Sequence, residues 1–223
     1  MKCFLFLFVF SCQGLVSGLF FAQKSAGIYK INFNIDRRLI NSVQVSQGNQ
    51  TIQSGGFNTV RLSDVDLDSI RQMIVNTVAQ ELNATSECVY RTTRSGRKIV
   101  SYDSGSQQRG MPVSTKKQAI KQFDKDYYVR VFISYSVVNS ITLGTSITGV
   151  SRFRPVVNIT IKAYNVERKR VYRKSVFVSD FDKLKSFQYT VNGVTIKNSE
   201  VLQPQQIREM LLKSLNELTE RGR

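Results

Sequence analysis

Three segments in the second half of the sequence alternate apolar and polar residues with the two-residue period of a β-strand. The first is DKDYYVRVFISYSVV, residues 124–138, in which valine, isoleucine and tyrosine occupy alternate positions. The second is PVVNITIKAY, residues 155–164, and the third is RVYRKSVFVSD, residues 170–180. Only the short charged segment NVERK, residues 165–169, separates the last two, and a connection of this length favours an antiparallel hairpin. The pattern therefore predicts an antiparallel sheet at the centre of the fold.

Three other segments have the apolar spacing of amphipathic helices. The strongest is SDVDLDSIRQMIVNTVAQELN, residues 63–83, where Ser63 is a suitable N-cap and Asp66 a capping-box-like partner. A shorter helix is expected from Thr115 to about Phe123, and a final helix at residues 203–221.

Weaker signals complete the expected order of elements. Strands are predicted at residues 29–35 and 39–45 and at about 88–90, and turns or loops at 46–58, 91–114, around Gly144 and Gly149, and around Gly193. The resulting order is β-β, α, β, α, β-β-β, α. It predicts a single α+β domain over residues 23–223, with a mixed, mainly antiparallel β-sheet and about three helices packed on one of its faces.

Residues 1–22 have the composition of a secretory signal peptide. Lys2 precedes the uninterrupted apolar run CFLFLFVF, and the polar residues and glycines that follow leave too few apolar residues to span a membrane. We therefore expect no transmembrane segment in the mature chain. Two processing sites compete, namely cleavage between Ala22 and Gln23, which we favour, and lipidation at Cys12.

The balance of charge limits the partners that this chain can bind. The 32 lysine and arginine residues outnumber the 16 acidic ones, so the net charge is +16. This excess favours an anionic lipid, an anionic polymer or an acidic protein as partner, although a solvated surface without a specific partner is the alternative. No nucleic-acid-binding module is recognisable, so we expect no specific nucleic-acid partner. With the signal peptide, these properties predict a periplasmic or outer-membrane-associated bacterial protein or, alternatively, a secreted one.

Basic residues gather in two segments of the chain. One is the glycine-containing loop at residues 91–114, and the other is the predicted hairpin, whose alternation should place several basic side chains on one face. We interpret the second as a candidate surface for phosphate or carboxylate groups, with an ordinary solvated strand face as the alternative. The candidate surface consists of Lys162, Arg168, Arg170, Tyr172 and Lys174.

No pattern of residues predicts catalysis or a cofactor. The chain has no histidine, which excludes histidine-based triads and most catalytic zinc sites. Ser114 and Lys117 match the S-x-x-K pattern of penicillin-recognising serine enzymes, but the companion motifs are absent, so we interpret the pair as a helix cap and a solvated lysine. Asp180 and Asp182 are interpreted as residues of a surface loop.

Metal and disulfide sites are not expected either. DVDLD, residues 64–68, resembles the start of an EF-hand loop, but Ser69 and Val75 occupy the positions of its required glycine and glutamate. Cys88 is the only cysteine outside the first 22 residues, and we interpret it as a small buried apolar residue.

The span from Lys116 to Val178 resembles part of a known group of bacterial envelope proteins. A short helix containing Ala119 leads into the step Asp126-Tyr127-Tyr128-Val129, and a hairpin ending in VYRKS follows a long strand. This order is similar to that of accessory proteins of the penicillin-binding-protein activator and curli-secretion lipoprotein type. The resemblance implies a small α/β domain that acts by binding partners and has no fixed active site, so it assigns no functional residues here.

Together these observations predict an exported, non-enzymatic binding or accessory protein of the cell envelope that uses a basic surface to contact an anionic lipid, polymer or protein. Two alternatives stay open. One is a secreted hydrolase that uses Ser114 and Lys117 or the two aspartates, and the other is a structural subunit whose edge strands pair between chains.

The competing processing sites lead to a direct test. We expect mass spectrometry of the protein from its native membrane and soluble fractions to find an N-terminus at Gln23, free or cyclised. An acylated Cys12 would contradict this expectation and show that the protein is a lipoprotein.

Overall fold

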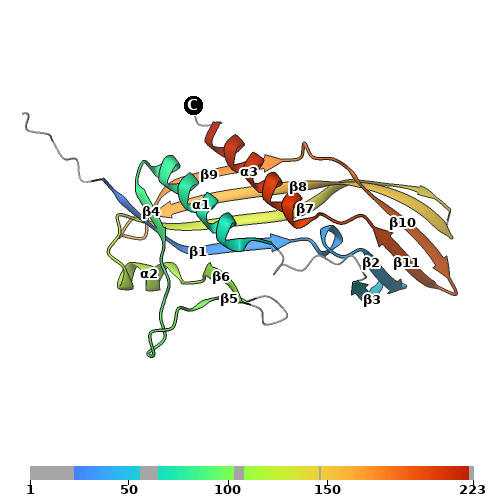
Figure 1. The fold of residues 1–223 in the computed structure, drawn as a ribbon, viewed down its shortest axis with the longest axis horizontal. Helices are drawn as coiled ribbons and strands as arrows, with labels where there is room; N and C mark the ends of the chain where they lie inside the picture. Colours follow the sequence, from blue (N-terminus) through green and yellow to red (C-terminus); the bar gives the residue numbers. More distant parts are fainter. Residues whose placement is uncertain (1–22, 56–64, 103–107, 146, 221–223) are drawn as a thin grey trace, which may run out of the picture.

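A single long hairpin organises the computed structural model, which describes residues 23–55, 65–102, 108–145 and 147–220 (Figure 1). Its strands are β7 (Tyr127–Gly144) and β8 (Thr148–Tyr164). At about 3.4 Å per residue, strands of this length extend for roughly 60 Å. The outer edge of β8 pairs with β9 (Arg170–Val178) near one end and with β10 (Leu184–Val191) near the other. The hairpin therefore joins two parts of the sheet.

The remaining strands extend the sheet from both sides of this hairpin. Beyond β7 lie β1 (Ser25–Ile35), which is parallel to β7, and β4 (Thr85–Cys88), which is parallel to β1. Beyond β10 lie β11 (Val194–Ser199), β2 (Val43–Gln47) and β3 (Gln50–Gly55), all antiparallel to their neighbours. A separate small hairpin contains β5 (Val100–Tyr102) and β6 (Gln108–Pro112). The predicted mixed, mainly antiparallel α+β domain is confirmed.

Helices pack on both faces of the sheet. On one face, α1 (Leu67–Leu82) and α3 (Pro204–Glu220) cover the main core, in which side chains such as Ile74 and Leu211 meet the inward-facing residues of β1, β7 and β8 (Figure 1). On the other face, α2 (Lys116–Gln122) packs against Tyr29 and Tyr128 in a second cluster. The expectation that all helices cover one face was wrong, because Tyr29 and Tyr128 offer an apolar surface on the opposite side.

The two internal helices begin with side-chain caps. The N-cap of α1 is Asp66, whose carboxylate accepts a hydrogen bond from the Ser69 N–H (3.0 Å), so the helix begins at Leu67. Ser63, the predicted cap, lies outside the described residues. The N-cap of α2 is Thr115, which forms a capping box with Gln118, as expected for a helix that begins at this point.

Several segments that the sequence predicts as loops form strands. The predicted strand at 39–45 is formed only in its last three residues, which belong to β2, because Leu39 ends a short 3₁₀ turn, Arg37–Leu39. The predicted turn at 46–58 contains β3. The region around Gly193 is the β10–β11 hairpin, closed by Asn192 and Gly193 with φ angles of 52° and 76°. Two consecutive positive φ angles belong to the type I′ turn, whose twist matches that of antiparallel strands.

The region around Gly144 also belongs to the sheet and not to an open loop. β7 continues to Gly144, and β8 begins only four residues later, at Thr148. Gly144 has φ of 155°, and a Cβ atom there would lie 2.2 Å from the Thr148 carbonyl oxygen. Only glycine allows the two strands to approach so closely at this end.

The far end of the sheet extends beyond the helices, and we call it the arm (Figure 1). The arm consists of β2, β3, β10 and β11 together with residues 141–144 of β7 and 148–153 of β8.

Candidate anion-binding site

Four basic residues form a row across four adjacent strands. Lys30 of β1 pairs with Arg130 of β7, Arg130 pairs with Lys162 of β8, and Lys162 pairs with Arg173 of β9. Residues paired directly across strands project from the same face, and neighbouring strands lie about 4.8 Å apart. We call Lys30, Arg130, Lys162 and Arg173 the cationic row.

The cationic row lies on the face of the sheet opposite α1 and α3. Its neighbours along the strands, Ile31 in β1 and Val131 in β7, point the other way, into the main core. Strand alternation therefore directs the four basic side chains away from that core, beside the part of the face that α2 covers. Arg173 is exposed, and Lys30, Arg130 and Lys162 are half-buried, so each residue of the row keeps some contact with solvent.

The row is electrostatically unfavourable without a partner. Like charges at directly opposed positions destabilise a sheet, and this row contains three such contacts in succession. Within the described residues, none of the four cations forms a salt bridge with a carboxylate. Proteins commonly retain a destabilising arrangement where function requires it. An anion bound along the row would offset the repulsion between the four cations.

An aromatic ring supports two of the four cations. The Arg130 Cζ atom lies 4.1 Å from the ring centroid of Phe132, and the Lys162 Nζ atom lies 5.4 Å from it. Attraction to the ring face orients both groups without neutralising their charge. The Arg130 Nε atom is buried and has no hydrogen-bond partner among the described residues.

Polar side chains continue the site along the strands. The next row across β1, β7, β8 and β9 is Asn32, Phe132, Thr160 and Ser175, and the row after it is Asn34, Ser134, Asn158 and Phe177. A hollow of about 290 Å³ is lined by Phe132, Ser134, Asn158, Thr160, Lys162 and Arg173. Hydroxyl and amide groups next to fixed cations can donate hydrogen bonds to phosphate, sulfate or carboxylate oxygens.

Two residues of the predicted surface lie on the opposite face, against α1. Lys174 Nζ contacts both carboxylate oxygens of Glu81 (2.9 and 3.0 Å), and the Tyr172 hydroxyl donates a hydrogen bond to the same carboxylate. The side chains of Glu81 and Lys174 are only 8% and 19% exposed. Burial, together with the hydrogen bond to Glu81, raises the pKa of Tyr172 above its ordinary value. This cluster attaches α1 to β9.

The other three predicted residues lie elsewhere on the hairpin. Lys162 is part of the cationic row, as described above. Arg168 occupies the turn with φ of 66°, and its carbonyl accepts a hydrogen bond from Lys116 Nζ (3.0 Å). A register shift in β9 places the exposed Arg170 opposite Tyr164, and not on the side of Tyr172 and Lys174. The expected common face for Arg168, Arg170, Lys174 and Tyr172 is therefore not formed, because this irregularity interrupts the alternation.

Sequence reasoning missed three of the four residues in the row. In the predicted strands, Lys30, Arg130 and Arg173 occupy the positions opposite the apolar stripe, so their outward direction could have been predicted. Their alignment depends on strand register, which the sequence pattern does not specify.

Of the two residue pairs considered for catalysis, Ser114 and Lys117 are not brought together, whereas Asp180 and Asp182 line one open hollow. Ser114 is 2% exposed and precedes the Thr115 cap, so it is neither the helix cap nor on the same helical turn as Lys117. Asp180 and Asp182 line this hollow together with Arg154, Phe181 and Lys183. Asp180 also accepts a hydrogen bond from Lys213 Nζ (3.1 Å), and Asp182 also lines a second pocket.

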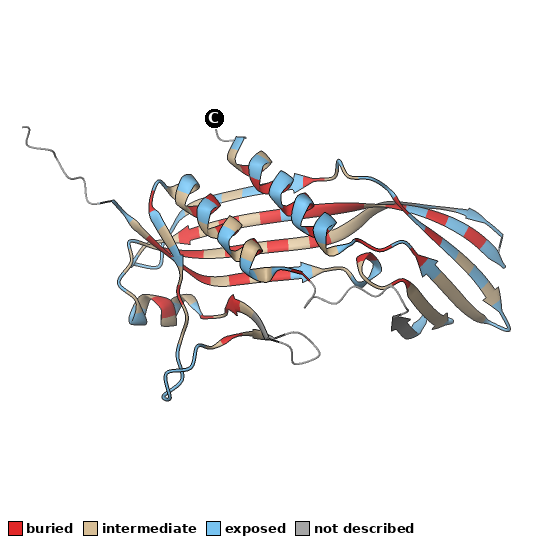
Figure 2. Cartoon of the chain, viewed as in Figure 1, coloured by how far each residue is buried: buried red, intermediate tan, exposed pale blue. Residues whose placement is uncertain are grey.

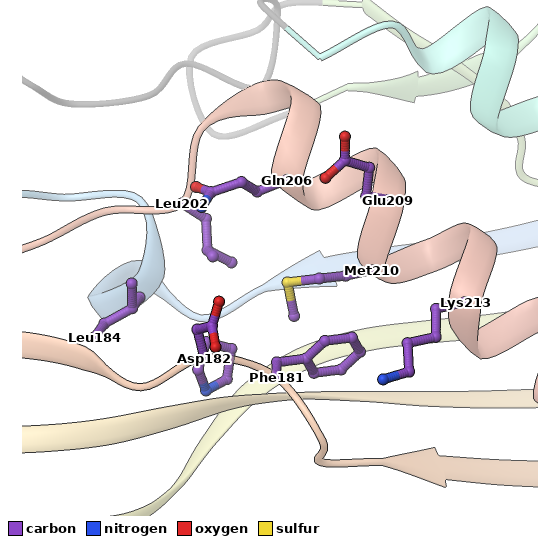
Figure 3. Close-up of a pocket in the computed structure, with 9 residues that line it drawn as sticks. Phe181, Asp182, Leu184, Leu202, Gln206, Glu209, Met210 and Lys213 are labelled. Carbon is purple, nitrogen blue, oxygen red and sulfur yellow. The ribbon is translucent and has the colours of Figure 1, made fainter.

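The pocket beside Asp182 lies between α3 and the segment that joins β9 to β10 (Figure 3). Its volume of about 200 Å³ is smaller than that of most small-molecule sites. In Figure 3, Met210 and Lys213 extend from α3 toward Phe181. The residues that line it are Pro155, Phe181, Asp182, Leu184, Leu202, Gln206, Glu209, Met210 and Lys213.

Cys88 is partly buried rather than fully enclosed. Burial raises the pKa of the Cys88 thiol to about 11, so the reactive thiolate is scarce at neutral pH. Among the described residues, no three cysteine or acidic side chains cluster to hold a metal ion, and no helix is long and apolar enough to cross a membrane.

Comparison with known proteins gives no family for this chain. No protein-family model matches it, and neither does any curated protein. The solved structures with some likeness include a neuraminyllactose-binding hemagglutinin homolog from Helicobacter pylori, with 5% identity, 90% coverage of this chain, 84% of that chain and a TM-score of 0.36. Another is a hypothetical protein from Chlamydia trachomatis, with 6% identity and a TM-score of 0.31. The match covers 90% of this chain and 96% of that chain. Likenesses this low carry no argument about fold or function.

Removal of the Glu81 carboxylate should cause a large loss of stability that depends on Lys174. We expect Glu81→Leu to lower the free energy of unfolding by about 3 kcal/mol, because it leaves the Lys174 ammonium buried without a counter-charge. Urea unfolding measures this change in the free energy of unfolding. The double variant Glu81→Leu with Lys174→Met should recover most of the loss, and equal losses in the single and double variants would contradict the ion pair's role.

The cationic row predicts the opposite effect on stability. Arg173→Gln should raise the free energy of unfolding by a few tenths of a kcal/mol at low salt, because it removes the repulsion between Arg173 and Lys162. The gain should disappear at 1 M salt, where the Debye length is about 3 Å. Arg208→Gln, an exposed charge on α3, serves as the control, and an equal gain from this variant would attribute the effect to net charge alone.

Proposed function

We propose that this chain is an exported, non-enzymatic binding protein of the bacterial cell envelope, and that it contacts an anionic partner through the cationic row. The observation that carries the proposal is the alignment of Lys30, Arg130, Lys162 and Arg173 on one accessible face without carboxylate partners among the described residues. The proposal retains Lys162 from the candidate surface and replaces its other members with residues of the row.

The geometry suits a partner with several negative groups. Cations repeated at intervals of about 4.8 Å across a sheet can contact successive groups of a polyanion or of an anionic surface at the same time. The asparagine, serine and threonine side chains in the adjacent rows supply hydrogen-bond donors. Affinity would come from many moderate contacts, so it should depend strongly on ionic strength.

Two features of the sequence support the location and the type of activity. The first 22 residues resemble a signal peptide, and they lie outside the described part of the structure. The span from Lys116 to Val178 resembles envelope accessory proteins that act by binding partners. Export would bring the basic chain close to the phosphate-bearing polymers and lipids of an envelope.

A soluble polyanion provides the test. We expect the purified protein to bind dextran sulfate and not neutral dextran, measured by calorimetry at low salt. The double variant Lys162→Gln with Arg173→Gln should bind about tenfold more weakly, since two surface contacts of about 0.7 kcal/mol each are lost.

A variant with the same net charge controls for long-range attraction. Arg168→Gln with Arg208→Gln also removes two positive charges but leaves the cationic row intact. We expect this variant to lose less than threefold in affinity. Equal losses in the two double variants would show that overall charge, and not the row, determines binding.

A further inference from the structure

The arm has two chemically different faces, and the apolar one is exposed. Leu143 of β7 pairs with Val150 of β8, and Val150 pairs with Phe187 of β10. Tyr189 pairs with Ile196 of β11, on the same side. We define the apolar arm face by its exposed members, which are Ile141, Leu143, Val150, Phe187, Tyr189 and Val191.

The opposite face of the arm carries small polar residues and is in part more buried. Ser151 and Ser186 are each 1% exposed, and Ser199 donates a hydrogen bond to Ser186 (3.0 Å). Thr190 and Thr195 are hydrogen-bonded to each other (2.9 Å). The usual arrangement of a half-buried sheet, with apolar residues inside and polar residues outside, is therefore reversed in the arm.

The exposure of the apolar arm face is large for a protein surface. Leu143 is 72% exposed, Phe187 55% and Val191 56%. Figure 2 shows exposed positions along the strands of the arm as far as its tip, whereas the strands beneath α1 and α3 consist mostly of buried and intermediate positions. Contiguous apolar surface of this kind marks a contact site for a lipid or protein partner.

The charges of the arm indicate which partner is favoured. Residues 43–55, 141–153 and 184–199 contain no aspartate or glutamate, and their charged residues are Arg152, Lys185 and Lys197. Arg152 pairs with Ile141 and with Lys185, so these two cations lie on the apolar face, at its boundary with the body of the protein. An apolar surface bordered by cations is complementary to an anionic lipid interface, where acyl chains lie beneath negative headgroups.

A second copy of the chain fits this face less well. A two-fold dimer through the apolar arm face would bring Arg152 and Lys185 of both copies to one interface. Glu200, whose carboxylate accepts a hydrogen bond from the Lys185 N–H (2.7 Å), offsets only part of this positive charge. A bilayer with anionic headgroups would instead attract these cations, and Tyr189 combines a ring with a hydroxyl, as suits a membrane interface.

We propose that the apolar arm face docks onto an anionic lipid bilayer, with Leu143, Phe187, Tyr189 and Val191 in the interfacial region and Arg152 and Lys185 against the headgroups. This inference rests on the proposed function in one respect, since it names an anionic lipid surface as the partner. The contact itself involves the arm and not the cationic row.

The absence of tryptophan from the chain makes a site-specific test possible. Tyr189→Trp introduces a single fluorescent reporter into the apolar arm face, and Leu212→Trp introduces a matched reporter at an exposed position of α3. The probes are vesicles of phosphatidylglycerol and phosphatidylcholine, with and without bromine on the acyl chains. We expect a blue shift and quenching by brominated lipid for Tyr189→Trp, and neither for Leu212→Trp.

A second set of variants measures the contribution of the apolar residues. Leu143→Ser with Phe187→Ser should lower the partition coefficient onto anionic vesicles about tenfold or more, because less apolar surface leaves water on binding. Val166→Ser with Leu212→Ser, which changes two exposed residues outside the arm, should leave it within twofold. All four substituted positions are exposed, so the fold should be retained, as circular dichroism and urea unfolding can verify.

The possible outcomes separate this proposal from the proposed function. Quenching confined to Tyr189→Trp, with loss of partitioning in the arm variant, supports lipid docking whether or not dextran sulfate binds. Equal quenching of both reporters, or no quenching of either, overturns lipid docking. If quenching is absent and light scattering shows a dimer that Leu143→Ser with Phe187→Ser abolishes, the apolar arm face binds a second copy of the chain instead. Loss of dextran sulfate binding in the row variant tests the cationic row separately.

Discussion

The pairing of β7 with β8 is the constraint on which the rest of the structure depends. Their ladder runs from Tyr128 opposite Tyr164 to Gly144 opposite Gly149, and it supplies both the floor of the main core and the base of the arm. Because β8 is longer than either neighbour on its outer edge, β9 and β10 occupy successive parts of that edge. The alternation along β8, together with the register of the strands paired with it, therefore determines which side chains enter the core, which form the cationic row and which are exposed on the arm.

The two faces of β9 carry basic residues in different surroundings, one paired with a carboxylate and the other exposed to solvent. Lys174 and Tyr172 point toward α1, where the Glu81 carboxylate neutralises the lysine and accepts hydrogen bonds from both side chains. Arg173, between them in sequence, points to the other face and joins Lys162 in the cationic row. A buried lysine needs a partner to offset its desolvation, whereas an exposed arginine is hydrated and can exchange water for an anion. Adjacent residues in one basic segment therefore have different roles.

Much of the fold follows from local patterns. The strands around residues 127–138, 155–164 and 170–178, the capped helix at Thr115 and the C-terminal helix agree with the predicted α+β order. The β10–β11 hairpin was missed although its signal is present, because Asn192-Gly193 lies between two alternating stretches and is the preferred type I′ turn. The position of α2 on the second face was missed for another reason. Tyr29 and Tyr128 are far apart in the sequence, and only strand pairing brings them together to form the surface that α2 covers.

The sequence by itself determined the fold class, the strongly basic character and the outward direction of Lys30, Arg130 and Arg173, because composition and two-residue alternation are local properties. Tertiary structure alone decided that these residues align with Lys162, that Lys174 forms an ion pair with Glu81, and that the apolar side of the arm is exposed. The physical reason is that strand register and the covering of a sheet face by helices are tertiary properties. Which residues oppose each other across strands, and which helix covers which face, depend on contacts between segments that are distant along the chain.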